Sequence, residues 1–186
     1  QRIDSRDNEV TFFLRKRLAD FDLDLETLGY FYINPWDRIH SGCDFGLVLN
    51  ETGFVKRARG RVGESVDHFR QATRLRRGRI LKAEKYSKKT GRKMPSYHIK
   101  NWALSLENLI SSLFFLGNLD EAARVLKCAE VDLGKWKPPL TQMMSLKAID
   151  GAIKHMKGDM KAATLAFEEG ERVAASDERN VIKRLH

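Results

Sequence analysis

The sequence contains few of the residues that build cross-linked, metal-binding or membrane-spanning proteins. Cysteine occurs only at Cys43 and Cys128, which supports neither a disulfide framework nor a zinc site and favours a reducing compartment. The five histidines include no pair four residues apart and none close to a cysteine, so no histidine-based metal cluster is expected. No apolar run approaches the roughly 18 residues that a spanning helix needs, and no secretory signal is visible.

Catalytic motifs are also missing. The chain has no Gly-x-Ser-x-Gly elbow and no phosphate-binding loop that ends in Gly-Lys-Ser or Gly-Lys-Thr. The acidic pair Glu168–Glu169 falls on a predicted helix surface, where solvated carboxylates are ordinary. We therefore expect no enzyme, no catalytic residues, no cofactor and no metal. Gln1 stands where an initiating Met would, which leaves a processed product and a piece of a longer chain both open.

The composition is that of a globular chain with room for a core. Its 186 residues favour one domain, with 42% hydrophobic and 32% charged residues. The clearest pattern lies in residues 101–132, where apolar residues recur at helical spacing, stop at Gly117-Asn118 and start again. The residues of the two stripes are Trp102, Leu106, Leu109, Ile110, Leu113, Phe114 and Leu116, then Leu119, Ala122, Ala123, Leu126 and Ala129. This predicts two helices joined by a tight corner.

The corner carries its own signals. Gly117 can adopt the left-handed backbone that ends a helix, and Asn118 or Asp120 can cap the next helix, with Glu121 in its first turn. A similar arrangement surrounds Gly60 and Gly158. After the glycine come an apolar residue at +2, a small one at +5, a large one at +9 and a small one at +12. The small residues let a partner helix approach and the large one fills the space between the helices. The three sets are Gly60, Val62, Ser65, Phe69 and Ala72; Gly117, Leu119, Ala122, Leu126 and Ala129; and Gly158, Met160, Ala163, Phe167 and Gly170.

This pattern resembles the tetratricopeptide repeat family. The likeness is carried by the corner glycines, the run from Asn118 to Ala122 and Gly158-Asp159, over about half of the chain. In the middle unit, Leu106 stands where the family favours Trp, and Ile110 stands where it favours Gly. In the first unit, Gly53 matches the family's Gly. The corner glycines are 57 and 41 residues apart, against a family period of about 34. The resemblance implies a helical solenoid that binds another macromolecule and does not catalyse a reaction.

We therefore predict an all-α fold in which antiparallel hairpins stack as a short solenoid. An N-terminal segment, 1–45, precedes a repeat domain, 46–186, with units at about 46–75, 101–133 and 141–175. The first segment is expected to hold a helix at 10–21, a short helix near 24–29 or a strand at 29–33, and an aromatic stretch at 30–36. That stretch either caps the repeats or forms a partner-binding surface.

The remaining boundaries come from local signals. The first hairpin is predicted at 45–59 and 64–77, and its second helix is expected to run on toward Tyr86. Gly91 and Pro95 indicate a loop, and residues 133–140 indicate a linker that Pro138 and Pro139 keep out of helix, with Trp136 packed. The last helix is predicted to end near Ala175, followed by a tail or one short helix.

Positive charge is concentrated in one quarter of the chain. The net charge is +9, but residues 56–100 alone hold 16 Lys and Arg against three acidic residues. We predict a basic insertion at 76–100 that contacts RNA phosphates through its cations and stacks bases on its tyrosines. The candidate RNA-binding residues are Arg74, Arg76, Arg77, Arg79, Lys82, Lys85, Lys88, Lys89, Arg92, Lys93, Tyr86 and Tyr97.

Other interpretations of this segment are a solvated helix extension, an anionic membrane surface or an acidic protein partner. The segment lacks an amphipathic face with large apolar residues, which disfavours the membrane.

Two functions follow. The first is a structural subunit of a ribonucleoprotein, above all a mitochondrial or other organellar ribosome, which docks neighbouring proteins through its repeats and rRNA through the basic insertion. The second is a repeat adaptor, or an accessory subunit of a membrane complex, without RNA contact. Under the first we expect an organelle matrix, otherwise the cytoplasm, and no membrane insertion.

Overall fold

The structure is a computed structural model that describes residues 45–185, with side chains up to Ala175. Within that range all regular elements are helices, which confirms the predicted all-α class. The predicted elements at 10–21, 24–29 and 29–33 and the aromatic stretch at 30–36 lie outside the described residues. The chain divides into two compact units, residues 1–78 and 79–186.

The described residues of the first unit form one helical hairpin. Helix α4, Phe45–Ala58, is followed by the opening turns of α5, Val62–Thr90. Val48 and Leu49 of α4 are buried, in a helix that is buried continuously from Val48 to Gly53. Val66 and Phe69 of α5 are also buried and lie three residues apart on one face. The end of α4 and the start of α5 lie within two residues of the predicted bounds, and α5 runs on past residue 77 as expected, ending four residues beyond Tyr86.

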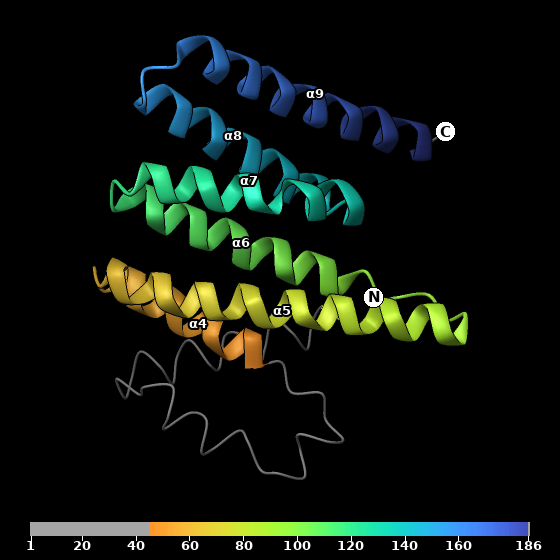
Figure 1. The fold of residues 1–186 in the computed structure, drawn as a ribbon. Helices are drawn as coiled ribbons and strands as arrows, with labels where there is room; N and C mark the ends of the chain where they lie inside the picture. Colours follow the sequence, from red (N-terminus) through yellow and green to blue (C-terminus); the bar gives the residue numbers. More distant parts are fainter. Residues whose placement is uncertain (1–44, 186) are drawn as a thin grey trace. The chain divides into compact units, whose positions relative to one another are not determined.

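The second unit contains the end of α5 and four further helices. These are α6, Tyr97–Phe115; α7, Leu119–Trp136; α8, Leu140–Met156; and α9, Met160–Leu185. Helix α8 packs against both α6 and α7, and α9 packs against α8 (Figure 1). The predicted hairpins around Gly117 and Gly158 are therefore confirmed as neighbouring helix pairs.

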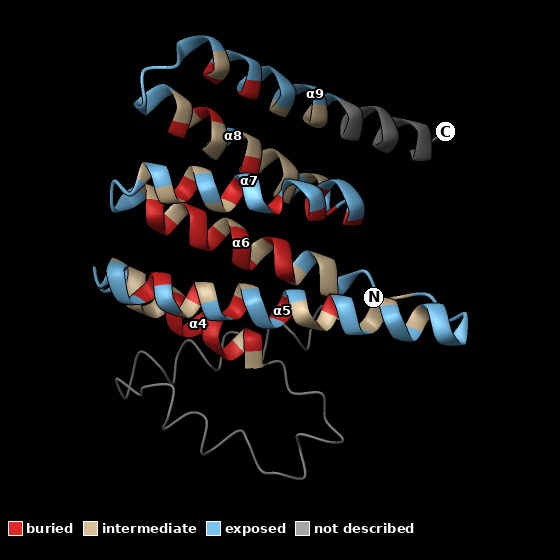
Figure 2. Cartoon of the chain, in the orientation of Figure 1, coloured by how far each residue is buried: buried red, intermediate tan, exposed pale blue. Residues whose placement is uncertain are grey.

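Helix α6 is the most buried element of this unit. Trp102, Leu106, Ile110 and Leu113 are each at most 1% exposed, and they lie on the apolar stripe that the sequence predicts. Figure 2 shows this burial along most of α6, whereas α9 is exposed over most of its described length. The core of the unit therefore lies around α6.

All three corners have the same backbone. Gly60, Gly117 and Gly158 have positive φ values of 76°, 74° and 83°. Each glycine N–H donates to the carbonyl three residues back, and the next N–H donates to the carbonyl five residues back. This is the Schellman arrangement that satisfies the last carbonyls of a helix. Glycine is required here because an L side chain strains the left-handed backbone.

The caps of the following helices differ. Asn118 occupies the N-cap position of α7 as predicted, but its side chain forms no capping hydrogen bond. At the last corner the Asp159 carboxylate accepts a hydrogen bond from the backbone N–H of Ala162 at 3.0 Å, which caps α9.

A second repeated feature is a glycine that faces a phenylalanine within a hairpin. In the first hairpin, Gly53 lies seven residues before the corner glycine and Phe69 lies nine residues after it. Gly151 and Phe167 have the same offsets in the last hairpin. A Cβ built on Gly53 would lie 2.7 Å from the Phe69 ring, and one built on Gly151 would lie 2.6 Å from the Phe167 ring.

The middle hairpin fills the same two positions with Ile110 and Leu126. It thus has two side chains of intermediate size where the other hairpins have a glycine and a phenylalanine.

Three predicted boundaries are wrong. Helix α7 continues to Trp136 through the first half of the predicted linker, and only Lys137, Pro138 and Pro139 join it to α8. Helix α9 does not end near Ala175 but continues to Leu185. Helix α6 begins at Tyr97, four residues before the predicted hairpin, because the loop after α5 is short.

Candidate nucleic-acid interface

The predicted basic insertion is not a separate loop. Helix α5 continues to Thr90, so that only residues 91–96 connect it to α6. The positive charge of this region is therefore carried on a regular helix, which fixes the spacing of its side chains. We use the name basic arm for six cations of the second unit, Lys82, Lys85, Lys88 and Lys89 of α5 and Arg92 and Lys93 of the loop.

Every residue of the basic arm is exposed. Lys82, Lys85 and Lys89 follow the i, i+3, i+7 spacing that places them on one face of the helix. They span about 10 Å along the axis at 1.5 Å per residue. Figure 2 shows the exposed surface of the last turns of α5. The arm is thus a row of cations on a rigid support.

The basic arm is not neutralised by neighbouring carboxylates. In the described part of the chain, none of its six side chains forms an ion pair with Asp or Glu. Like charges placed this close repel one another and create a positive potential that attracts a polyanion.

Glu84, the acidic residue within this segment, points to α7 instead. Its carboxylate accepts a hydrogen bond from Lys135 Nζ at 2.7 Å and another from Trp136 Nε1 at 2.8 Å. The hydrogen bond from Lys135 is the main reason that the pKa of Glu84 is lowered, with smaller contributions from Trp136 and Lys88. Glu84 therefore joins α5 to the end of α7 and leaves most of the arm's charge uncompensated.

Trp136 fixes this connection in the core. Its ring packs edge-on against Trp102 of α6, with centroids 4.9 Å apart, and the two side chains are 6% and 1% exposed. An edge-to-face aromatic pair adds about 1 kcal/mol to the free energy of burial. The packing of Trp136 predicted from the sequence is confirmed, whereas its hydrogen bond to Glu84 carried no sequence signal.

Both candidate tyrosines are at the surface. Tyr86 of α5 is 55% exposed and Tyr97, the first residue of α6, is 50% exposed. Tyr86 follows Lys82 by four residues, so it lies beside the lysine row on the helix. The Tyr97 ring lies 4.1 Å from the ring of His98. Exposed rings beside cations are the arrangement on which unpaired bases stack.

The four predicted arginines differ in their surroundings. Arg74 and Arg77 are exposed and Arg79 is half-buried. Arg76 is only 3% exposed, so the prediction that it contacts RNA disagrees with its burial. Arg76 follows the spacing of Phe69 and Ala72, which places it on the buried face of α5. Arg74, Arg76 and Arg77 belong to the first unit, and the site described here is confined to the second.

The remaining expectations from the sequence concern metal ligands, thiols and membrane spans in the residues that the structure describes. Among them no three His, Cys, Asp or Glu side chains lie close enough to hold a metal ion. Cys128 is a free and exposed thiol. Within residues 45–185, no helix combines the length and the apolar character needed to cross a membrane.

Comparisons with known proteins do not assign the chain to a family. No family model, no curated protein and no solved structure matches it. The functional interpretation therefore rests on the residues and their geometry.

Proposed function

We propose that the chain is a non-catalytic structural subunit of a large ribonucleoprotein, in which it contacts RNA through the basic arm and neighbouring proteins through its helical hairpins. The particle we propose is a mitochondrial or other organellar ribosome, which places the protein in an organelle matrix. The observation that carries the proposal is the set of six exposed cations without ion pairs, four on α5 and two in the loop that follows, beside an acid, Glu84, that α7 binds.

The charge and the rigidity of the arm support a polyanion as its ligand. Lysines that neutralise phosphates release condensed counterions, which makes binding favourable and strongly dependent on salt. Because four of the cations lie on a helix, little backbone order has to be gained there on binding, although the lysine side chains still lose rotamer freedom. A single-stranded nucleic acid is favoured over a duplex because exposed Tyr86 and Tyr97 can stack unpaired bases, and RNA is the single strand that a ribonucleoprotein supplies.

The repeat geometry supports a scaffold of the tetratricopeptide type. All three corners share one backbone arrangement, and two hairpins place a phenylalanine ring over a glycine at identical offsets from the corner. Such repeats serve as extended supports for other macromolecules. The proposal is a degenerate repeat scaffold, with the basic arm at the connection between two hairpins.

Sedimentation of a cell extract through a density gradient tests this function. The protein should migrate with ribosomal particles at low salt and move to the light fractions in about 0.5 M KCl, where exposed charges are screened within a few ångströms. The second candidate, a protein-only adaptor, predicts partners that remain bound after nuclease treatment and in high salt. That outcome would exclude the ribonucleoprotein proposal.

A further inference from the structure

Helices α8 and α9 enclose an open groove on the surface of the second unit. The groove has a volume of about 650 Å³, and mostly small or apolar residues line it. On both helices the lining residues follow the i, i+3, i+4, i+7 spacing of one helical face. They are Thr141, Met144, Ser145 and Ala148 of α8, and Phe167, Gly170, Glu171 and Ala174 of α9.

The same positions of the preceding hairpin show what such a groove accommodates. The two corner glycines, Gly117 and Gly158, are 41 residues apart, and adding 41 to a residue of the α6–α7 hairpin gives its counterpart in α8–α9. Phe167, Glu171 and Ala174 of the groove correspond in this way to Leu126, Glu130 and Leu133 of α7.

Those three α7 residues face a helix. They line a cavity of about 220 Å³ together with residues of α8 that include Met143, Leu146 and Lys147. Leu126 and Leu133 are accordingly only 8% and 7% exposed, whereas Phe167 is 41% exposed. On the α6–α7 hairpin this face is covered by α8. On the α8–α9 hairpin the corresponding face is open, and no helix among the described residues packs on it.

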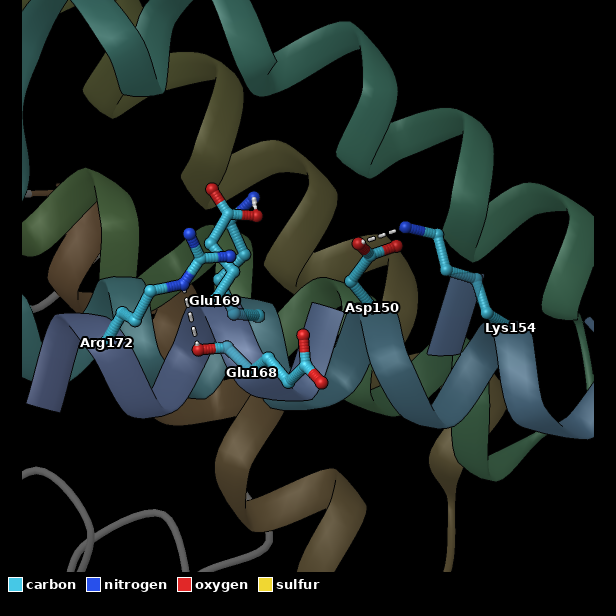
Figure 3. Close-up of polar contacts among 6 residues, drawn as sticks. Asp150, Lys154, Glu168, Glu169 and Arg172 are labelled. Atoms are coloured by element: carbon cyan, nitrogen blue, oxygen red, sulfur yellow. Dashed lines mark hydrogen bonds and ion pairs between the residues drawn. The ribbon is translucent and has the colours of Figure 1, made fainter. Parts of the chain in front are cut away.

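One polar contact joins the two helices of the groove, and two more lie within the helices themselves. Lys147 of α8 forms an ion pair of 2.8 Å with Glu169 of α9, and Lys154 forms one of 2.7 Å with Asp150 within α8 (Figure 3). Arg172 Nε donates to the carbonyl oxygen of Glu168 at 3.4 Å within α9. None of these contacts uses Glu171, which leaves its carboxylate at the edge of the groove.

We infer that the α8–α9 groove binds an amphipathic helix of a partner protein. By analogy with α8, the partner helix carries apolar residues at positions i and i+3, as at Met143 and Leu146, and a cation at i+4, as at Lys147. The apolar pair covers Phe167 and Ala174. The cation lies near Glu171 because Lys147 lines one cavity with Glu130, the counterpart of Glu171, although the ion pair of Lys147 itself is with Glu169. This inference deepens the protein-docking part of the proposed function and is independent of RNA.

A peptide that copies residues 140–156, held helical by a lactam bridge on its outer face, is the probe. Fluorescence anisotropy with the full chain should show saturable binding with a dissociation constant on the order of 100 µM, typical of one helix in a shallow groove. A scrambled peptide of the same composition should not bind. Absence of saturation up to about 1 mM would overturn the inference.

Two variants locate the binding. Ala148→Arg fills the groove from an exposed position and should weaken binding at least about tenfold, whereas Ala58→Arg at the exposed end of α4 should not change it. A peptide with Lys147→Glu should bind Glu171→Lys more tightly than the unchanged chain. Equal affinity for the unchanged chain and Ala148→Arg would place the peptide elsewhere and overturn the inference.

The same proteins separate this inference from the RNA contact. Ala148→Arg should leave RNA binding unchanged, and neutralising Lys82, Lys85 and Lys89 should leave peptide binding unchanged. Peptide binding without RNA binding would retain the groove and refute the ribonucleoprotein proposal. RNA binding without peptide binding would refute the groove and retain the basic arm.

Discussion

The ring of Phe167 lies directly over the backbone of Gly151, so that a Cβ at Gly151 would lie 2.6 Å from the ring. Phe69 has the same relationship to Gly53, at 2.7 Å. The two rings differ in their freedom to move, because Phe69 is completely buried and Phe167 is 41% exposed. This difference makes the two glycines unequal in what they tolerate.

Gly53→Ala should destabilise the protein by about 1–3 kcal/mol, the usual cost of overpacking a close-packed site. Gly151→Ala should cost less, because the Phe167 ring can move toward solvent and alanine favours helix over glycine by roughly 1 kcal/mol. Gly134→Ala is the matched control, since a Cβ there meets nothing within 4 Å, and it should stabilise. Urea unfolding measures all three, and equal effects at Gly53 and Gly134 would contradict the packing.

The corner glycines are needed for their left-handed backbone, and a side chain at these positions would meet no neighbouring atom. Gly158 has φ 83° and nothing within 4 Å of a built Cβ. Gly158→Ala should cost about 1 kcal/mol through left-handed strain, whereas Gly158→Asn should cost clearly less because Asn tolerates that backbone. Thermal unfolding compares the two variants. If Ala and Asn lower the melting temperature equally, strain at this corner is not the cause.

The contact of Glu84 with Lys135 and Trp136 should stabilise the second unit. Glu84→Gln keeps the size of the side chain but loses the charge that Lys135 contacts, and should cost about 1 kcal/mol, since the pair is partly solvated. The fluorescence of Trp136 should also change, because its indole N–H donates to the Glu84 carboxylate. Lys127→Gln, an exposed lysine without an ion pair, is the control.

Acid should remove this stabilisation. The folded pKa of Glu84 is lowered, so the unfolded chain binds its proton first and stability rises with pH across that interval. The difference in unfolding free energy between the native chain and Glu84→Gln should be constant above the ordinary glutamate pKa of 4.5. It should shrink as the pH falls through the lowered value. A difference that stays constant down to pH 3 would show that Glu84 is not held by Lys135.

The sequence predicts the corners well because their signal is local. Gly60, Gly117 and Gly158 each follow an apolar stripe, and only a left-handed residue ends a helix in this way. The buried stripe of α6 was equally visible, because Trp102, Leu106 and Ile110 recur at helical spacing. These features depend on residues close together in the chain.

The ends of the helices and the contact of Glu84 with α7 could not be predicted from neighbouring residues in this way. Pro138 and Pro139 indicated a linker over residues 133–140, but Trp136 remains helical because Trp102 and Glu84, both distant in sequence, bind it. Arg76 appeared to be one more cation of a basic run. Its spacing from Phe69 and Ala72 was the signal of burial, which composition alone conceals.

The most direct test measures the affinity of the chain for a single-stranded RNA of about 20 nucleotides at several salt concentrations. Replacing Lys82, Lys85 and Lys89 by Gln should weaken binding and lower the slope of log K against log salt by about 2, since each phosphate contact contributes roughly 0.7. The control replaces Arg124, Lys127 and Lys161, which are also exposed, and should leave the slope unchanged. Equal slopes for the two triple variants would contradict an RNA contact through the basic arm.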